Sequence, residues 1–173
     1  LEDTEATQHR KIFTLLGVDY VMTPRAWVNI PLMLVVGIVL ALILVPADSS
    51  SPILIGIGYG ILIMIASFCH GLGHIISSRM VGAPMTALVS TATVYLTHYD
   101  DTETYPSRVH VGRSIGGPAL NFIVGVIALA LYSSVNSHFL LFFGGVNLLF
   151  AVLTILPIPS VDGVPLKAPK LCI

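Results

Sequence analysis

Four long apolar runs dominate the sequence and restrict the folds that are open to it. They cover residues 27–45, 52–77, 115–135 and 139–156. Each is close to the ~20 residues that a helix needs to cross the hydrocarbon core of a bilayer. Charged residues make up only 10% of the chain, whereas a soluble domain carries about 25%. Because backbone polar groups inside lipid must bond to one another, we predict an α-helical membrane protein with four transmembrane helices and a membrane core over residues 26–163.

The positions of the basic residues predict how the chain is oriented. With four spans, an N-terminal arm (residues 1–25), the 79–113 connection and a C-terminal tail (residues 164–173) fall on one side of the membrane. The other two connections, 46–52 and 133–138, contain no lysine or arginine. Positive residues favour the cytoplasmic side, so both termini are predicted to be cytoplasmic. The eight basic residues are Arg10, Lys11, Arg25, Arg79, Arg108, Arg113, Lys167 and Lys170.

The ends and the net charge of the chain add further expectations. Its first 20 residues are polar and acidic, unlike a secretory signal peptide. The sequence has no initiating Met, and its tail has no obvious stopping feature, which is compatible with truncation at either end. The formal net charge is −1, and nothing indicates a nucleic-acid partner.

The connection between the second and third apolar runs differs in kind from the runs themselves. "TALVSTATVYLTH" (residues 86–98) is rich in Thr, Val and Tyr with partial alternation, and "SRVHV" (residues 107–111) alternates again. The polar segment "YDDTETYP" separates the two. β-Branched and aromatic residues that alternate around a polar turn are typical of strands. We therefore predict a small cytoplasmic β-hairpin or sheet between the second and third helices.

Two histidines near the cytoplasmic end of the second run are candidate metal ligands. His70 and His74 are four residues apart, about one helical turn, so they face the same way and could hold one ion. Ionisable residues inside spans are costly and tend to be functional, although they could also bond to neighbouring helices. The second and fourth spans both run toward the cytoplasm, so Asp162, which follows the fourth span, is the candidate third ligand. Asp48 is predicted to lie on the opposite side of the membrane and so cannot be that ligand.

Three sequence elements together carry a resemblance to a known family. An H-x-x-x-H helix is followed by a G-P-x-x-N helix start and then by L-P-x-P-x-x-D-G, all within residues 52–163. This order and spacing resemble the site-2 protease family of intramembrane zinc metalloproteases, which cut substrate helices near the membrane surface. The resemblance implies zinc held by His70, His74 and Asp162, and an unwound substrate added as a strand at the 86–98 region. It also implies site-lining roles for Gly117, Pro118, Asn121, Thr154, Pro157 and Pro159.

The sequence departs from that family at two positions. Gly71 occupies the place of the glutamate that acts as general base, and a glycine can neither accept nor return a proton. General acid–base catalysis is worth ~10²–10⁴-fold, so its loss is expected to be severe. Thr154 replaces an asparagine, which weakens any hydrogen bond to substrate made there. Three acidic residues of the connection could replace the base if they fold back toward the histidines: Asp100, Asp101 and Glu103.

Three functional hypotheses remain open from the sequence. The favoured one is a pseudoprotease that keeps its metal site and binds membrane helices of a substrate or partner, or serves as a subunit of a larger membrane complex. The second is an active intramembrane zinc metalloprotease in which Gly71 is engineered or misassigned. The third is a cofactor-binding subunit of a pigment-protein or haem assembly, since histidines of membrane helices also ligate tetrapyrroles. The carboxylate of Asp162 favours zinc over a tetrapyrrole. Membrane lipid is the expected surrounding in every case.

Overall fold

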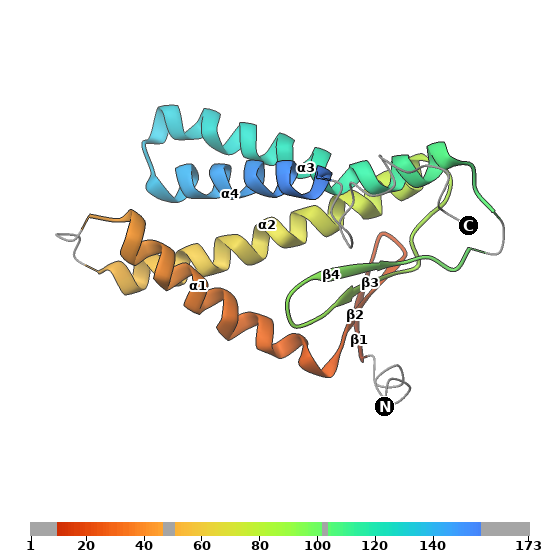
Figure 1. Cartoon of the computed structure of the whole chain (residues 1–173), viewed down its shortest axis with the longest axis horizontal. Coiled ribbons are helices and arrows are strands. Elements are labelled where there is room, and N and C mark those ends of the chain that lie inside the picture. Colours follow the sequence, from red (N-terminus) through yellow and green to blue (C-terminus); the bar gives the residue numbers. More distant parts are fainter. Residues whose placement is uncertain (1–9, 47–50, 102–103, 157–173) are drawn as a thin grey trace.

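Four long helices form the body of the molecule. The structure, a computed structural model, describes residues 10–46, 51–101 and 104–156. Within these residues the helices are α1 (Asn29–Leu44), α2 (Pro52–Met80), α3 (Ser107–Val135) and α4 (His138–Ile155) (Figure 1). Each is long and apolar enough to cross a membrane, α1 together with the short 3-10 helix η1 (Pro24–Val28) that precedes it. The predicted class, an α-helical membrane protein with four spans and a small sheet, is confirmed.

The helix ends follow local sequence signals. Pro52 opens α2, where its fixed φ suits the helix and its missing amide costs nothing. Asn136 closes α3 in the left-handed conformation, with φ 51°, a role that asparagine fills readily. Ser137 then precedes α4 in an extended conformation. This two-residue link makes α3 and α4 antiparallel neighbours.

The start of α3 differs from the expectation. "SRVHV" was predicted to be a strand and the third span to begin at residue 115, but α3 already begins at Ser107. Its buried residues include Val109, Arg113 and Gly116, a spacing of three to four that is helical rather than alternating. The strand prediction for this segment is wrong, because five residues are too few to separate a period of two from one of 3.6.

Small residues bring the helix backbones close together. A Cβ added at Gly37 of α1 would meet the backbone of Gly56 and Gly60 on α2. A Cβ at Gly73 of α2 would likewise meet the backbone of Gly116 on α3. Helices in lipid gain little from the hydrophobic effect between them, so close backbone packing of this kind is a main source of their association.

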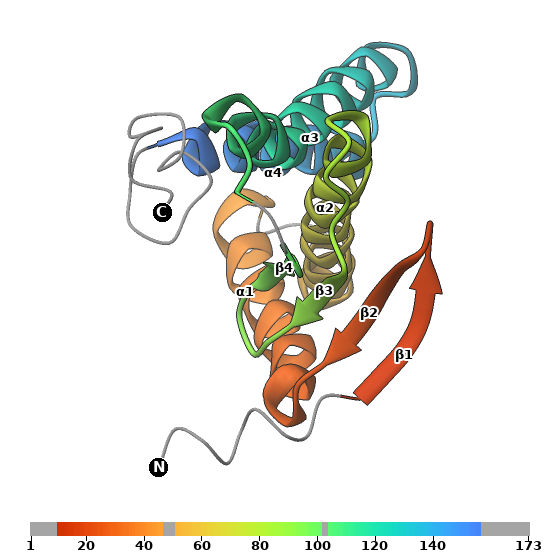
Figure 2. The ribbon, with the colours of Figure 1, turned by 90° about the vertical axis from the view of Figure 1, so that its right-hand side faces the viewer.

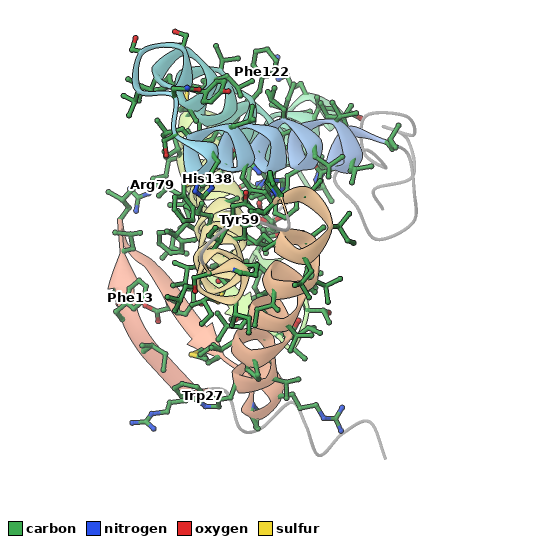
Figure 3. The ribbon with its side chains drawn as sticks, turned by 90° about the vertical axis from the view of Figure 1, so that its left-hand side faces the viewer. Phe13, Trp27, Tyr59, Arg79, Phe122 and His138 are labelled. Carbon is green, nitrogen blue, oxygen red and sulfur yellow. The ribbon has the colours of Figure 1, made fainter. Side chains whose placement is uncertain are left out.

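Apolar side chains cover the outer faces of the helices. Leu42, Leu54 and Phe122 are 60%, 67% and 57% exposed, and Figure 3 shows Phe122 on the outer side of α3. Such faces suit a lipid surrounding. Toward the end of α2 that lies away from the sheet, the Tyr59 hydroxyl is 3.4 Å from His138 Nδ1 and joins α2 to the start of α4 (Figure 3).

A four-stranded sheet lies beside one end of the helices. Its strands are β1 (Arg10–Leu15), β2 (Val18–Met22), β3 (Ala87–Ser90) and β4 (Tyr95–His98), in spatial order β1-β2-β3-β4. β3 pairs antiparallel with β4, as expected for the 86–98 region, and pairs parallel with β2, with Asp19 opposite Ala87 and Met22 opposite Ser90. β3 is therefore an internal strand, and β1 and β4 are the edges.

The β1–β2 hairpin was missed in the sequence, which was interpreted as an arm over residues 1–25. The turn between the strands consists of Leu16 and Gly17, with φ 49° and 68°. Two positive φ values are the requirement of the tight hairpin turns that match strand twist. Apolar residues on both sides of this Leu-Gly pair were the signal, but a leucine is an unusual residue for a positive φ.

The sheet packs against the C-terminal part of α2. Val18, Ile75, Met85 and Leu88 are each at most 2% exposed and form one buried cluster, so that strands β2 and β3, α2 and the link after α2 share it. Figure 2 shows β2 and β3 alongside α2. This packing fixes the sheet next to the part of α2 that carries the two histidines.

Candidate metal centre

The two histidines of α2 point at each other. His70 Nε2 and His74 Nε2 are 3.1 Å apart, and His74 is only 4% exposed. Two nitrogen ligands at ~2.0–2.1 Å from a tetrahedral zinc ion lie about 3.3 Å apart. The pair therefore has the separation that two ligands of a single ion need.

The outer nitrogen of His74 is held by α3. His74 Nδ1 lies 2.9 Å from the carbonyl oxygen of Arg113, and Ser77 Oγ donates to the same oxygen at 3.1 Å. A carbonyl can only accept, so this contact places the His74 proton on Nδ1 and leaves Nε2 unprotonated. Metal-ligating histidines typically have such a partner on the other ring nitrogen. In this tautomer His70 Nε2 donates to His74 Nε2.

The "GGPALN" segment of α3 forms the wall opposite the histidines. A Cβ added at Gly117 would lie 2.5 Å from both Nε2 atoms, so only a glycine leaves room for the pair. Pro118 is fully buried, and Asn121, one turn further along the same face, is 0% exposed. Neither amide atom of Asn121 has a hydrogen-bond partner among the described residues. An unsatisfied buried amide is costly, which makes Asn121 a candidate ligand-binding side chain.

Replacing Gly117 tests this close approach. We expect Gly117→Ala to lower the free energy of unfolding by about 1–3 kcal/mol, because the added methyl group forces the imidazoles or α3 to move. The control is Gly145→Ala on α4, since a Cβ there meets nothing within 4 Å, and it should leave stability nearly unchanged. Thermal unfolding in detergent measures both. Equal stability of the two variants would contradict the tight wall.

Gly71 faces the sheet rather than open space. A Cβ added there would lie 2.8 Å from Leu88 Cδ2, and Leu88 is 1% exposed within the cluster that joins α2 to the sheet. The space beside the histidines that a longer side chain would enter is therefore filled by a leucine of β3.

The acidic residues considered as substitute bases do not reach the histidines in the described part of the chain. Asp101 accepts two hydrogen bonds from the Arg113 guanidinium, at 2.6 and 2.7 Å. This partner lowers the pKa of Asp101, so its carboxylate is a weaker base than usual. Asp100 accepts a hydrogen bond from His98 at the exposed end of β4. Glu103 lies outside the described residues.

Several other predicted site residues have limited structural description. Thr154 donates its hydroxyl to the Phe150 carbonyl of its own helix at 2.7 Å, which leaves it no free proton for a substrate. Asp162, Pro157 and Pro159 lie outside the described residues. Among residues 10–46, 51–101 and 104–156 there is accordingly no group of three or more potential metal ligands.

Two buried polar residues were missed from the sequence. Arg113 is 4% exposed and bridges several elements, whereas in the sequence it stood out only as one of the basic residues that predict the orientation. Asn147 of α4 is 0% exposed; its Nδ2 donates to the Phe143 carbonyl at 2.8 Å, and its Oδ1 has no partner in the described part of the chain. A lone asparagine within an apolar run was the available signal for the latter.

Comparison with known proteins bears on the fold. No protein-family model and no curated protein sequence matches the chain. Among solved structures, the chain is similar to a site-2 protease from Methanocaldococcus jannaschii, with a TM-score of 0.65 and 18% sequence identity. The similarity covers 95% of this chain and 74% of that one. With four apolar helices, a small sheet and this likeness over nearly its whole length, the chain has the fold of a site-2 protease.

Proposed function

We propose that this protein is an integral membrane pseudoprotease that keeps a metal site and binds membrane helices without cutting them. The observation that carries the proposal is the convergence of His70 Nε2 and His74 Nε2 on either side of a glycine. Two nitrogen atoms lie close enough to share an ion, while Gly71 between them has no side chain that could carry a proton. The sequence supplies Asp162 as the third proposed ligand.

The proposed residues divide into those that bind and those that orient. His70, His74 and Asp162 would hold zinc, which when bound supplies Lewis-acid polarisation of a carbonyl. The Arg113 carbonyl orients His74 through Nδ1. Gly71 can neither take up nor return a proton. Because the base is worth ~10²–10⁴-fold, the remaining groups support binding far better than hydrolysis.

Asn121 and the sheet edge suit a peptide as the bound partner. The Asn121 amide offers one acceptor and two donor hydrogens, which complements the N–H and C=O of an unwound backbone. β3 is paired on both sides, so a strand-like partner would add at the edge strand β4, within the 86–98 region. Strand addition supplies affinity through main-chain hydrogen bonds. We infer that the partner is a transmembrane helix that unwinds near the membrane surface.

The proposed orientation places the sheet and both termini in the cytoplasm. The basic residues all fall on one side of a four-span topology, which the positive-inside tendency identifies as cytoplasmic. The pairing of β2 with β3 supports one part of this arrangement, because strands before α1 and after α2 must then lie on the same side of the bilayer, whichever side that is.

A cleavage assay tests the loss of hydrolysis. Purified protein with zinc is expected to leave a panel of membrane-helix substrates intact in detergent and in liposomes, while an active site-2 protease under identical conditions cleaves its own substrate. Gel analysis and mass spectrometry measure the products. Specific cleavage that a chelator abolishes would overturn the pseudoprotease proposal and favour an active enzyme.

A further inference from the structure

The side chain of Arg113 is fixed by four groups from different parts of the chain. Its guanidinium makes the paired hydrogen bonds to Asp101 described above, and its Nε donates to the Ala83 carbonyl at 2.9 Å. The same guanidinium lies 4.1 Å from the ring centroid of Tyr99 and 4.8 Å from that of Tyr105. We call this set of contacts the Arg113 clamp. It joins α3 to the link after α2 and to the segment after β4.

The main chain of the same residue contacts the metal centre. The Arg113 carbonyl oxygen accepts from His74 Nδ1 at 2.9 Å and from Ser77 Oγ at 3.1 Å. One residue therefore has its charged end in the clamp and its carbonyl on the ring that would bind the ion. With its side chain 5% exposed, the guanidinium is a buried cation, and its bidentate pairing with Asp101 is of the strong, geometrically specific kind.

We propose that Arg113 is a positioning residue for His74: the clamp holds the Arg113 carbonyl against Nδ1, which keeps the proton there and the Nε2 lone pair directed at the metal site. This deepens the proposed function and rests on His74 as a ligand. Which of its two neutral tautomers a histidine adopts is determined by the hydrogen bonds of its ring nitrogens. A carbonyl that moves away would let the proton shift to Nε2, where it blocks coordination.

Helix packing alone is the competing explanation for the carbonyl position. α2 and α3 are in close contact at Gly73 and Gly116, and this contact does not involve the Arg113 side chain. If packing suffices, removing the clamp changes stability but leaves the His74 tautomer as it is. The tautomer therefore separates a positioning role from a merely structural one.

The tautomer is measured in the full chain without metal. Histidines are labelled with ¹⁵N, and the His74 signals are assigned by comparison with His74→Ala, in detergent at about pH 8, above the ordinary histidine pKa of about 6.5. Wild-type His74 is expected to show a protonated Nδ1 and an unprotonated Nε2. Arg113→Met should give a mixture of tautomers. Arg113→Lys, which keeps the charge, should restore part of the wild-type signal.

The control and a second variant complete the test. Arg108→Met removes an exposed cation from the same helix and should leave the His74 signals unchanged. Asp101→Asn weakens the clamp without altering α3, so it provides the readout if Arg113→Met does not fold. A folded Arg113→Met or Asp101→Asn protein with the wild-type His74 tautomer would overturn the inference.

Zinc affinity in the same variants separates this inference from the proposed function. Loss of an outer partner of a metal-binding histidine typically weakens binding ~10–100-fold, which we expect for Arg113→Met but not for Arg108→Met. Wild-type protein that binds no zinc would overturn the proposed function, and the tautomer measurement alone would then decide whether Arg113 positions His74. Zinc affinity that is equal in wild type and a folded Arg113→Met would overturn the positioning role.

Discussion

Purified wild-type protein is expected to carry about one equivalent of zinc, and the double substitution His70→Ala, His74→Ala is expected to remove it. The two Nε2 atoms are 3.1 Å apart, close enough to share the proposed ion, so their loss should exceed the ~10–100-fold weakening that follows loss of an outer partner. Elemental analysis of protein purified without added metal, followed by zinc titration, measures both the content and the affinity.

The control for that experiment is another histidine of the same chain. His98 lies at the end of β4 with a largely exposed side chain paired to Asp100, so His98→Ala should retain the wild-type zinc content. Zinc that persists in the double variant would place the ion elsewhere. Circular dichroism shows whether the double variant is folded. If it is not, the zinc content of the single variants His70→Ala and His74→Ala is compared with that of the wild type.

A glutamate introduced at position 71 is expected to destabilise the fold unless the side chain of Leu88 is shortened as well. Gly71→Glu alone should lower stability by at least about 1–3 kcal/mol, because the new Cβ lies 2.8 Å from Leu88 Cδ2 and the carboxylate enters an apolar cluster. Leu88→Ala alone should cost about 2–5 kcal/mol through the cavity it leaves. In the double variant the two costs should partly cancel, with a coupling energy of about 0.5–3 kcal/mol.

Only that double variant is expected to gain zinc-dependent cleavage, by ~10²–10⁴-fold over the wild type if the base is the missing element. The matched control is Gly71→Gln with Leu88→Ala, which has the same size but cannot act as a base. It should show the stability of the glutamate variant without its cleavage. A Gly71→Glu protein that is as stable as the wild type and active by itself would show that Leu88 does not obstruct the position.

The membrane part of the fold was predictable because its signal is local. A run of about 20 apolar residues can cross a bilayer only as a helix, and the four runs became α1 to α4. The sheet was predictable only in part. β3 and β4 are close in sequence and alternate, whereas β2 finds its parallel partner β3 across two helices, and nothing in either strand specifies a partner so far away.

The candidate site likewise has a part that a local sequence pattern predicts and a part that depends on long-range packing. The spacing of His70 and His74 on one helix predicted that their side chains face the same way, and their Nε2 atoms do converge. That they share a metal ion stays a prediction. The contacts of Arg113 and Leu88 could not be predicted from the sequence, because both depend on how α3 and the sheet pack against α2. An arginine just before an apolar run indicates an orientation but not the partner to which it binds. Asp162, Pro157 and Pro159 lie outside the described residues, so their roles stay predictions.

The parallel pairing of β2 with β3 has a consequence for how the chain is made. Parallel strands need a crossover connection, and here that connection consists of α1 and α2, both long enough to cross a membrane. β2 ends at Met22 and β3 begins at Ala87, so during synthesis β2 has no parallel partner until both helices have been made. A chain in which only one of the two helices inserts leaves β2 and β3 on opposite sides of the membrane. The pairing of β2 with β3, and the buried cluster of Val18, Ile75, Met85 and Leu88 beneath it, therefore depend on α1 and α2 crossing the membrane as a pair.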